Sequence, residues 1–162
     1  QTLGTCAINL SGASIEDEGL ADFILACIEE HRVPPQMLCF EITETVAVRN
    51  LLKVVSIVER LRSAGCNIAL DDFGAGMSSF GYLKNLPLDL IKIDRSFIVD
   101  LDTDPISHTI ISAIAKIGHQ RGLKVVAEGV STDHLCEAAR SLGVDYAQGF
   151  GLHRPERVQF QR

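Results

Sequence analysis

Asn67-Ile68-Ala69-Leu70-Asp71-Asp72-Phe73-Gly74 joins an apolar run to two adjacent carboxylates and a glycine. Neighbouring anions repel each other, so a fold that places Asp71 and Asp72 at a strand end holds them with a cation or a strong hydrogen-bond donor. A solvated loop or a helix N-terminus is the alternative, since both accept acidic residues. The pair is a candidate metal site, and the rest of the chain decides between these interpretations.

Composition predicts one globular domain spanning residues 1–162. The chain has 162 residues, of which 46% are hydrophobic and 22% charged, enough for a single well-filled core. Its formal charge of −6, without a Lys/Arg cluster, argues against general nucleic-acid binding. Any phosphate that the protein handles would therefore need metal ions.

Several residue patterns point to a cytoplasmic protein. The five cysteines form no Cys-x-x-Cys pair, so we expect buried thiols, and the five scattered histidines do not suggest a zinc site. No apolar run approaches the roughly 18 residues of a membrane span, and no signal peptide opens the chain. A membrane-anchored parent with this chain on its cytoplasmic side stays open.

Strand and helix patterns alternate along the chain. The expected strands are 6–10, 37–42, 67–70, 88–93, 124–127 and 144–147. Two helices are expected in the first half of the chain, one with Leu20, Phe23, Ile24, Cys27 and Ile28 on its apolar face and one through Leu51, Val54, Val58 and Leu61 that ends at Gly65. A short helical turn follows at 79–84. Two further helices are expected over 105–121, with an apolar stripe of Ile106, Ile110, Ala113, Ile114 and Ile117, and over 132–142.

This alternation predicts an α/β fold with a parallel sheet, either doubly wound or closed as a (β/α)₈ TIM-type barrel. A polar residue stands at or just beyond the end of each expected strand: Asn9, Glu41, Asp71 with Asp72, Lys92, Glu128 and Gln148. A barrel collects one such side chain from each strand, whereas an open sheet concentrates its site at a switch point. We therefore expect about six C-terminal βα units of a barrel, with about two more upstream of Gln1.

Six strings carry a specific resemblance. They are Asn9-Leu10-Ser11, Glu41-Ile42-Thr43-Glu44, Leu70-Asp71-Asp72-Phe73-Gly74-Ala75-Gly76, Ile91-Lys92-Ile93-Asp94, Val126-Ala127-Glu128-Gly129-Val130 and Ala147-Gln148-Gly149-Phe150. In this order they resemble the EAL domain family, metal-dependent phosphodiesterases that hydrolyse cyclic di-GMP to linear pGpG. The family's Glu-Ala-Leu signature is expected before Gln1, so the chain would be an N-terminally truncated EAL-type phosphodiesterase domain.

The resemblance implies two divalent cations, Mg²⁺ or Mn²⁺. The residues that match the family's metal set are Asn9, Glu41, Asp71, Asp72 and Glu128, with Asp71 as the bridging carboxylate. Two such cations roughly 3.5–4 Å apart ionise a water and neutralise charge on the phosphoryl oxygens. One further ligand, the glutamate of the signature, would come from upstream.

The resemblance also assigns catalytic roles. Glu128 matches the general base, Lys92 would help to hold the attacking water, and Gln148 would hydrogen-bond within the metal and water shell. Glu44 resembles a residue that pins the loop after Asp72, and Asp94 is expected beside the site. Taken singly, each has a simpler interpretation: strand-end hydrogen bonding for Asn9 and Gln148, a helix N-terminal acid cluster for Glu41 and Glu44, an ion pair for Lys92 with Asp94 and a capped turn for Glu128.

Regulation and partners are inferred from the loop 74–79, whose glycines permit movement beside the aspartates. In the family this loop lies near a dimer interface, so a homodimer is expected, with Met77, Phe80 and Leu83 in a packing contact. Met77 replaces the usual tyrosine, and Ser131 replaces a common second glutamate. Phe150 is a candidate to stack on guanine or to belong to the core.

Other functions remain open from sequence alone. A catalytically impaired relative could bind cyclic di-GMP as a receptor, although retention of the metal set argues against this. A different barrel enzyme could use Lys92 as a Schiff base, or Mg²⁺ on the acids as in enolases. We further expect sensory or GGDEF-type domains upstream, and we expect the 162-residue piece alone to fold poorly and to be inactive.

Overall fold

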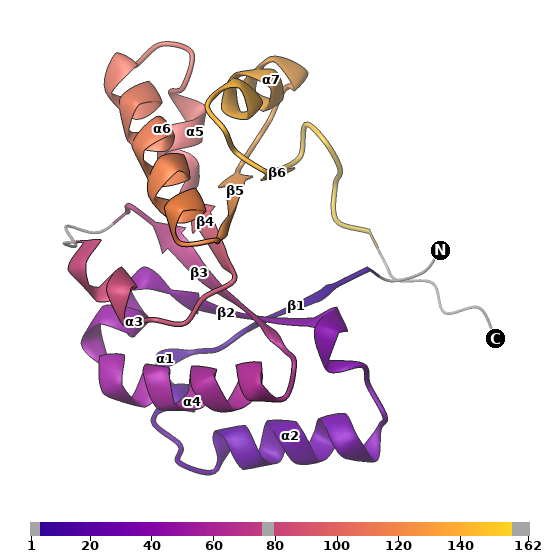
Figure 1. Ribbon diagram of the computed structural model, residues 1–162. Coiled ribbons are helices and arrows are strands. Elements are labelled where there is room, and N and C mark those ends of the chain that lie inside the picture. Colours follow the sequence, from indigo (N-terminus) through magenta and orange to yellow (C-terminus); the bar gives the residue numbers. More distant parts are fainter. Residues whose placement is uncertain (1–3, 76–79, 157–162) are drawn as a thin grey trace. The chain divides into compact units, whose positions relative to one another are not determined.

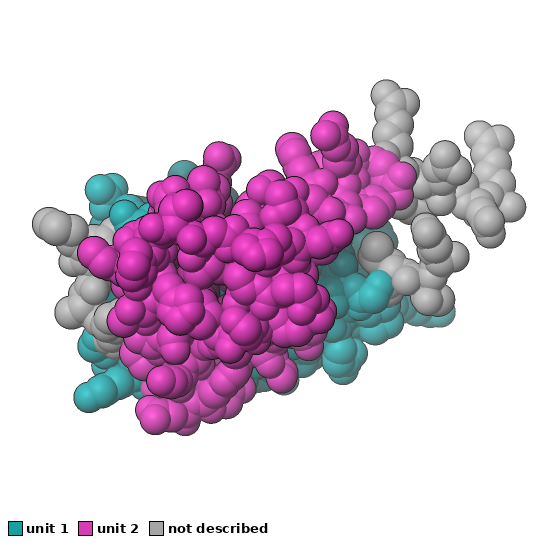
Figure 2. Space-filling view, turned by 90° about the horizontal axis from the view of Figure 1, so that it is seen from above, with its two compact units in different colours: residues 1–92 teal, residues 93–162 magenta. Residues whose placement is uncertain are grey.

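The computed structural model describes residues 4–75 and 80–156, with no side-chain description for Phe80. Helices and parallel strands alternate along it, and the six strands follow chain order in the sheet, from β1 to β6 (Figure 1). Two compact units divide the chain, residues 1–92 and residues 93–162, coloured teal and magenta in Figure 2. Each unit is described separately below.

The first unit contains most of the strands. In order, its elements are β1 (Cys6–Asn9), α1 (Gly12–Ile15), α2 (Leu20–Glu30), η1 (Pro35–Met37), β2 (Leu38–Thr43), α3 (Glu44–Arg49), α4 (Leu51–Ser63), β3 (Asn67–Phe73), η2 (Phe80–Lys84) and β4 (Leu90–Ile93), which reaches the boundary. The second unit contains α5 (Arg95–Val99), α6 (Pro105–Gln120), β5 (Lys124–Glu128), α7 (Asp133–Ser141) and β6 (Tyr146–Gln148).

The core of the first unit lies between its sheet and its long helices. Strands β1, β2 and β3 pair in parallel, and Figure 1 shows α2 and α4 side by side along them. The fully buried side chains of β2, β3 and α4 include Phe40, Ile42, Ile68, Leu70, Val54, Val58 and Leu61. At about 25 cal/mol per Å² of apolar surface, this contact is the main stabilisation of the unit. The expected helix through Leu51 and Leu61 is confirmed.

In the second unit, α6 packs closely on β5. A Cβ atom placed on Gly118 would lie 2.8 Å from Val125 Cγ2, so a larger residue would force Val125 to shift. The buried positions of α6 are Ser107, Ile111, Ile114, Ala115 and Gly118. The buried face of α6 therefore begins with Ser107 and Ile111, one residue after the expected Ile106 and Ile110, although Ile114 belongs to both sets. Ile106 is 68% exposed. Phe23 of α2, expected on an apolar face, is also 68% exposed.

The structure extends the predicted strands and adds short helices. Strand β3 continues past Leu70 through Asp71 and Asp72 to Phe73, so the aspartates belong to the strand itself. Helices α1, α3 and α5 were absent from the sequence prediction. Met77 and most of the loop 74–79 fall outside the described residues.

Two aspartates fix the entry of strands in the same way. Asp89, just before β4, exchanges backbone and side-chain hydrogen bonds with Ile68 of β3, both at 2.9 Å. Asp145, just before β6, exchanges the same pair of bonds with Val125 of β5, again at 2.9 Å each. We call these two residues the strand-entry aspartates. Each anchors the start of one strand to the second residue of the strand that precedes it in the chain.

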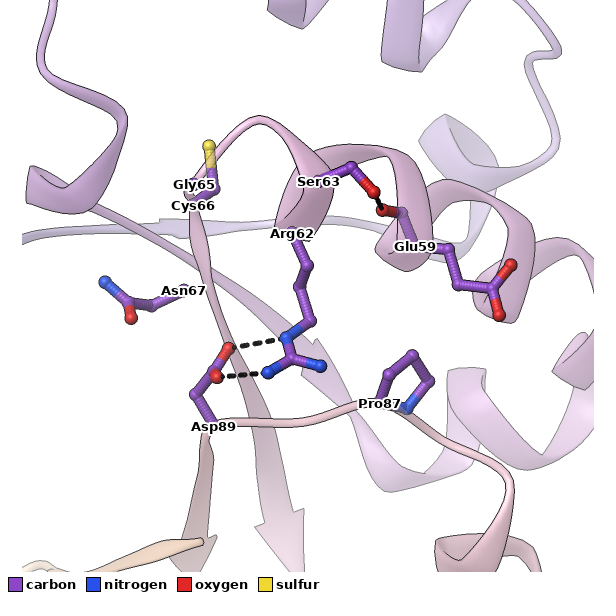
Figure 3. A pocket seen from close by; sticks show the side chains of 8 residues that line it. All are labelled: Glu59, Arg62, Ser63, Gly65, Cys66, Asn67, Pro87 and Asp89. Carbon is purple, nitrogen blue, oxygen red and sulfur yellow. Dashed lines mark hydrogen bonds and ion pairs between the residues drawn. The ribbon is translucent and has the colours of Figure 1, made fainter. Parts of the chain in front are cut away.

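Cations complete both strand-entry aspartates. Arg62 binds Asp89 through two hydrogen bonds, of 3.1 Å and 2.8 Å, at the side of a hollow of about 610 Å³ (Figure 3). Asp145 accepts hydrogen bonds from Lys124 at 2.7 Å and from His119 at 2.8 Å. Burial acts to raise the pKa of Asp145, but the Lys124, His119 and Val125 donors outweigh it and lower that pKa from 3.8 to about 2.

The cysteines are thiols, but only two of the five are buried, Cys39 and Cys66. Burial, with Glu41 and Asp89 nearby, raises the pKa of Cys39 to about 11. This thiol therefore stays protonated at neutral pH and is a poor nucleophile.

Among the described helices, none is both long enough and apolar enough to cross a bilayer.

We predict that Asp145→Asn lowers the free energy of unfolding by about 1 kcal/mol at neutral pH, since exposed partners screen the interaction. Because the folded-state pKa is depressed, the stabilisation is complete above pH 4 and is lost as the pH falls towards 2. Urea unfolding at several pH values measures it. A matched Asp100→Asn change at an exposed site is the control, and an Asp145→Asn deficit that does not shrink at low pH contradicts the prediction.

Candidate metal centre

Strand register places three of the predicted site residues on one face of the first unit's sheet. Asn9 pairs with Glu41 across β1 and β2, and Glu41 pairs with Ala69 across β2 and β3. Asp71 follows Ala69 by two residues, and side chains two apart in a strand point to the same face. The sequence pattern and the sheet geometry thus direct Asn9, Glu41 and Asp71 to the same side.

A buried ammonium group joins two of these carboxylates. Lys92 of β4 is only 6% exposed, and its Nζ donates a hydrogen bond of 2.8 Å to Glu41 Oε2. The same Nζ lies 2.9 Å from Asp71 Oδ1. Burying charge is unfavourable unless opposite charges pair, so the three groups stabilise one another inside the unit.

Asp71 keeps coordination capacity despite this ion pair. Its buried Oδ1 accepts no aligned hydrogen bond in the described part of the chain, and its partner there is the Lys92 ammonium at 2.9 Å. Glu41 and Asp71 together carry two formal negative charges against the one positive charge of Lys92, so a bound cation would balance the remaining charge. The atoms in this set that could bind a metal are carboxylate and amide oxygens, the ligands that Mg²⁺ and Mn²⁺ prefer. The residues present therefore fit a divalent metal.

Asp72 departs from regular strand geometry. Its φ is +53°, in the left-handed region that few non-glycine residues adopt, and Gly74 follows at +94°. Regular alternation would point Asp72 away from Asp71, but this turn breaks the alternation. A carboxylate oxygen of Asp72 lies within 4.8 Å of one of Asp71, a separation that one cation could span. Asp72 is exposed, whereas Asp71 is partly buried.

Glu44 anchors the backbone after this turn. It is the first residue of α3 and is 4% exposed. Its Oε2 accepts the Gly74 N–H at 3.0 Å, and its Oε1 accepts the Tyr82 hydroxyl at 2.7 Å. The Glu44 side chain therefore connects α3, the end of β3 and η2.

The other predicted residues lie in the second unit. Glu128 and Gln148 end β5 and β6 and are partners in their register. The loops that follow contact each other through backbone, since Val130 N–H donates to Gln148 O and Gly151 N–H donates to Val130 O, both at 3.0 Å. A Cβ on Gly149 would lie 2.1 Å from Val130 O, so this contact requires glycine.

Asp94 and Phe150 have local roles in the structure. The Asp94 carboxylate caps α5 by accepting the Ser96 N–H at 2.9 Å. Phe150 is 69% exposed, which excludes a core position, and its ring centroid lies 6.0 Å from the Arg154 guanidinium carbon.

Sequence reasoning missed Tyr82 and the strand-entry aspartates. An Asp between apolar residues, as in Leu88-Asp89-Leu90 and Val144-Asp145-Tyr146, is the signal that could have found the latter.

Comparison with known proteins shows the family. The EAL domain model matches residues 2–155, nearly the whole chain. This chain belongs to the EAL domain family. The predicted resemblance, which was based on six short strings, is thus confirmed.

Two curated relatives and one solved structure illustrate the likeness of this EAL chain. The cyclic di-GMP phosphodiesterase PdeB of Shewanella oneidensis is 37% identical over 150 residues, which are 93% of the chain and 18% of PdeB. MucR of Pseudomonas aeruginosa, named a bifunctional diguanylate cyclase and cyclic di-GMP phosphodiesterase, is 42% identical over 149 residues, 92% of the chain and 22% of MucR. The chain thus spans about a fifth of each relative.

The solved structure is described as the PaMucR phosphodiesterase in complex with c-di-GMP. It is 41% identical, with a TM-score of 0.87 over 93% of this chain and 61% of that one. This likeness confirms the expected α/β fold, in which parallel strands and helices form part of a TIM-type barrel.

We predict that Lys92→Gln lowers the free energy of unfolding by about 3 kcal/mol in metal-free buffer, because removing one partner leaves buried carboxylates unpaired. Denaturant unfolding in EDTA measures this. Lys53→Gln is the matched control, since Lys53 is half-exposed and lies 4.0 Å from Glu16. Its loss should stay below about 1 kcal/mol. Equal losses for the two variants would show that the buried ion pair has no special weight.

Proposed function

We propose that this EAL chain supplies most of the catalytic site of a metal-dependent phosphodiesterase that hydrolyses cyclic di-GMP to linear pGpG. The observation that carries the proposal is the buried group of Glu41, Lys92 and Asp71, in which two carboxylates share one ammonium. Family membership supports it, since relatives such as PdeB are named cyclic di-GMP phosphodiesterases.

The proposed metal set comprises Asn9, Glu41, Asp71, Asp72 and Glu128. The first four end β1, β2 and β3 or lie close to those ends, and Glu128 ends β5. Each of these residues thus stands at or near the carboxyl end of a strand, the place where barrel enzymes carry their catalytic residues. When bound, two divalent cations, Mg²⁺ or Mn²⁺, lower the pKa of water and offset phosphoryl charge.

The protein side chains then direct a single displacement. A water oxygen bonds to phosphorus as one P–O ester bond of the cyclic dinucleotide breaks, and the freed sugar oxygen takes a proton from solvent to become a hydroxyl. We assign Glu128 to accept the proton of the water. Lys92 holds Glu41 and Asp71 in place and adds positive charge near the phosphate, and Gln148 orients the water by hydrogen bonding.

The chain's setting in the cell is also part of the proposal. The relatives are several times longer than this chain, and MucR is named for two activities. We propose a cytoplasmic signalling protein that carries further sensory or GGDEF-type domains and acts as a homodimer. One residue favours a second candidate function, a receptor that binds cyclic di-GMP without cleaving it. Ser131, exposed in the loop after β5, stands where the family commonly has a second glutamate.

We predict that Asp71→Asn and Glu128→Gln, made in the protein with its natural flanking residues, each lower hydrolysis by about 10²–10⁴-fold. Asp71→Asn should also weaken binding of Mn²⁺, because it removes a negative ligand. Chromatographic separation of linear from cyclic dinucleotide measures the rate. Glu137→Gln, an exposed change in α7 next to Arg140, is the matched control and should leave the rate unchanged.

Three results would overturn this proposal. Full turnover in Asp71→Asn or Glu128→Gln would remove that residue from the machinery. Binding of cyclic di-GMP by the unmodified protein without any linear product, at saturating Mg²⁺ and at saturating Mn²⁺, would instead establish the receptor. Trapping of Lys92 by borohydride with a carbonyl substrate would indicate a Schiff-base enzyme.

A further inference from the structure

The Glu44 carboxylate is held by two donors from different parts of the first unit. The Gly74 amide reaches Oε2 from the turn that ends β3, and the Tyr82 hydroxyl reaches Oε1 from η2. Glu44 itself is buried. Among the described residues, each carboxylate oxygen thus has one donor, and the orientation of the carboxylate depends on both.

The Gly74 end of this arrangement lies beside the candidate metal ligands. Gly74 follows Asp72 by two residues, and Ala75 N–H donates to Asp72 O at 3.2 Å to close the turn. Asp72 and Gly74 both have positive φ values, +53° and +94°. A hydrogen bond from Gly74 to this buried carboxylate restrains the turn, which includes the backbone that carries the Asp72 side chain.

The Tyr82 end keeps Glu44 immobile. Burial of the phenol, together with the hydrogen bond to Glu44 and its negative charge, raises the pKa of Tyr82 well above its usual range. The hydroxyl thus remains a donor at any physiological pH. Without it, Oε1 of Glu44 would have no donor among the described residues, and the carboxylate would rotate or draw in water at the expense of the Gly74 bond.

We propose that Tyr82 is a positioning residue for the metal centre: its hydroxyl orients Glu44, which in turn fixes the Gly74 turn and the Asp71–Asp72 pair. The catalytic part of this inference rests on the proposed function. The part that concerns metal affinity and the Gly74 turn does not.

The test compares Tyr82→Phe with Tyr146→Phe in the protein with its natural flanking residues. The chain contains two tyrosines, and Tyr146 is 55% exposed on β6, so both variants lose one hydroxyl. Hydrogen exchange of the Gly74 amide and Mn²⁺ affinity by EPR titration are measured on each. Tyr82→Phe should speed Gly74 exchange about tenfold and raise the Kd for Mn²⁺ about three- to tenfold, while Tyr146→Phe changes neither.

A double-mutant cycle shows whether Tyr82 acts through Glu44. In a Glu44→Gln background, Tyr82→Phe should change the Mn²⁺ Kd by less than about twofold, because the carboxylate that it orients is gone. The Mg²⁺ concentration for half-maximal hydrolysis should rise in Tyr82→Phe by the same factor as the Mn²⁺ Kd, with kcat at saturating metal nearly unchanged. Equal effects of Tyr82→Phe in both backgrounds would contradict the inference.

A purely structural role predicts a different pattern. Tyr82→Phe would then lower global stability while Gly74 exchange in the folded protein and the Mn²⁺ Kd stay at their original values, and this result overturns the inference. If Tyr82→Phe does not fold, the unmodified protein still decides, since saturating Mn²⁺ should slow Gly74 exchange by reciprocal coupling. A Gly74 amide that is insensitive to Mn²⁺ overturns the inference as well.

These measurements also separate the inference from the proposed function. An unmodified protein that binds Mn²⁺ but does not hydrolyse cyclic di-GMP defeats the function, while the exchange and affinity data still test Tyr82. An active protein in which Tyr82→Phe behaves as Tyr146→Phe defeats only the role of Tyr82.

Discussion

The buried ammonium of Lys92 is the interaction on which the candidate site depends. Glu41 is 8% exposed and Asp71 is partly buried, and both would repel each other in a core of apolar side chains. Lys92 lies 2.8 Å from one and 2.9 Å from the other, so it permits two carboxylates to share one face of the sheet. Two carboxylates against one ammonium leave one formal negative charge unbalanced in this group, which a bound cation would offset.

The surrounding fold holds these groups from several directions. At the end of β3, the Gly74 amide and Tyr82 meet on Glu44, beside the left-handed turn at Asp72. The strand-entry aspartates fix the opposite ends of β4 and β6 to the starts of β3 and β5. A strand anchored at its start cannot slip by one residue, and such a slip would turn Lys92 to the other face.

Much of this arrangement follows from sequence, because polar residues at the ends of apolar strands are readily recognised. Strand alternation located Glu41, Asp71 and Lys92. It did not predict that Lys92 pairs with both acids, because Lys92 and Glu41 are 51 residues apart in the sequence. The stripe of α6 was misplaced because adjacent Ile110 and Ile111 fit two helical faces, and only the close approach at Gly118 selects the second. Tyr82 gave no signal, since its partner Glu44 is 38 residues away.

Mn²⁺ binding measured by EPR tests most directly the proposal that Asp71 and the acidic residues near it hold two divalent cations. The protein with its natural flanking residues should bind two Mn²⁺ ions per chain with magnetically coupled signals, as expected for ions about 4 Å apart. A single ion, or two ions without coupling, would contradict the account.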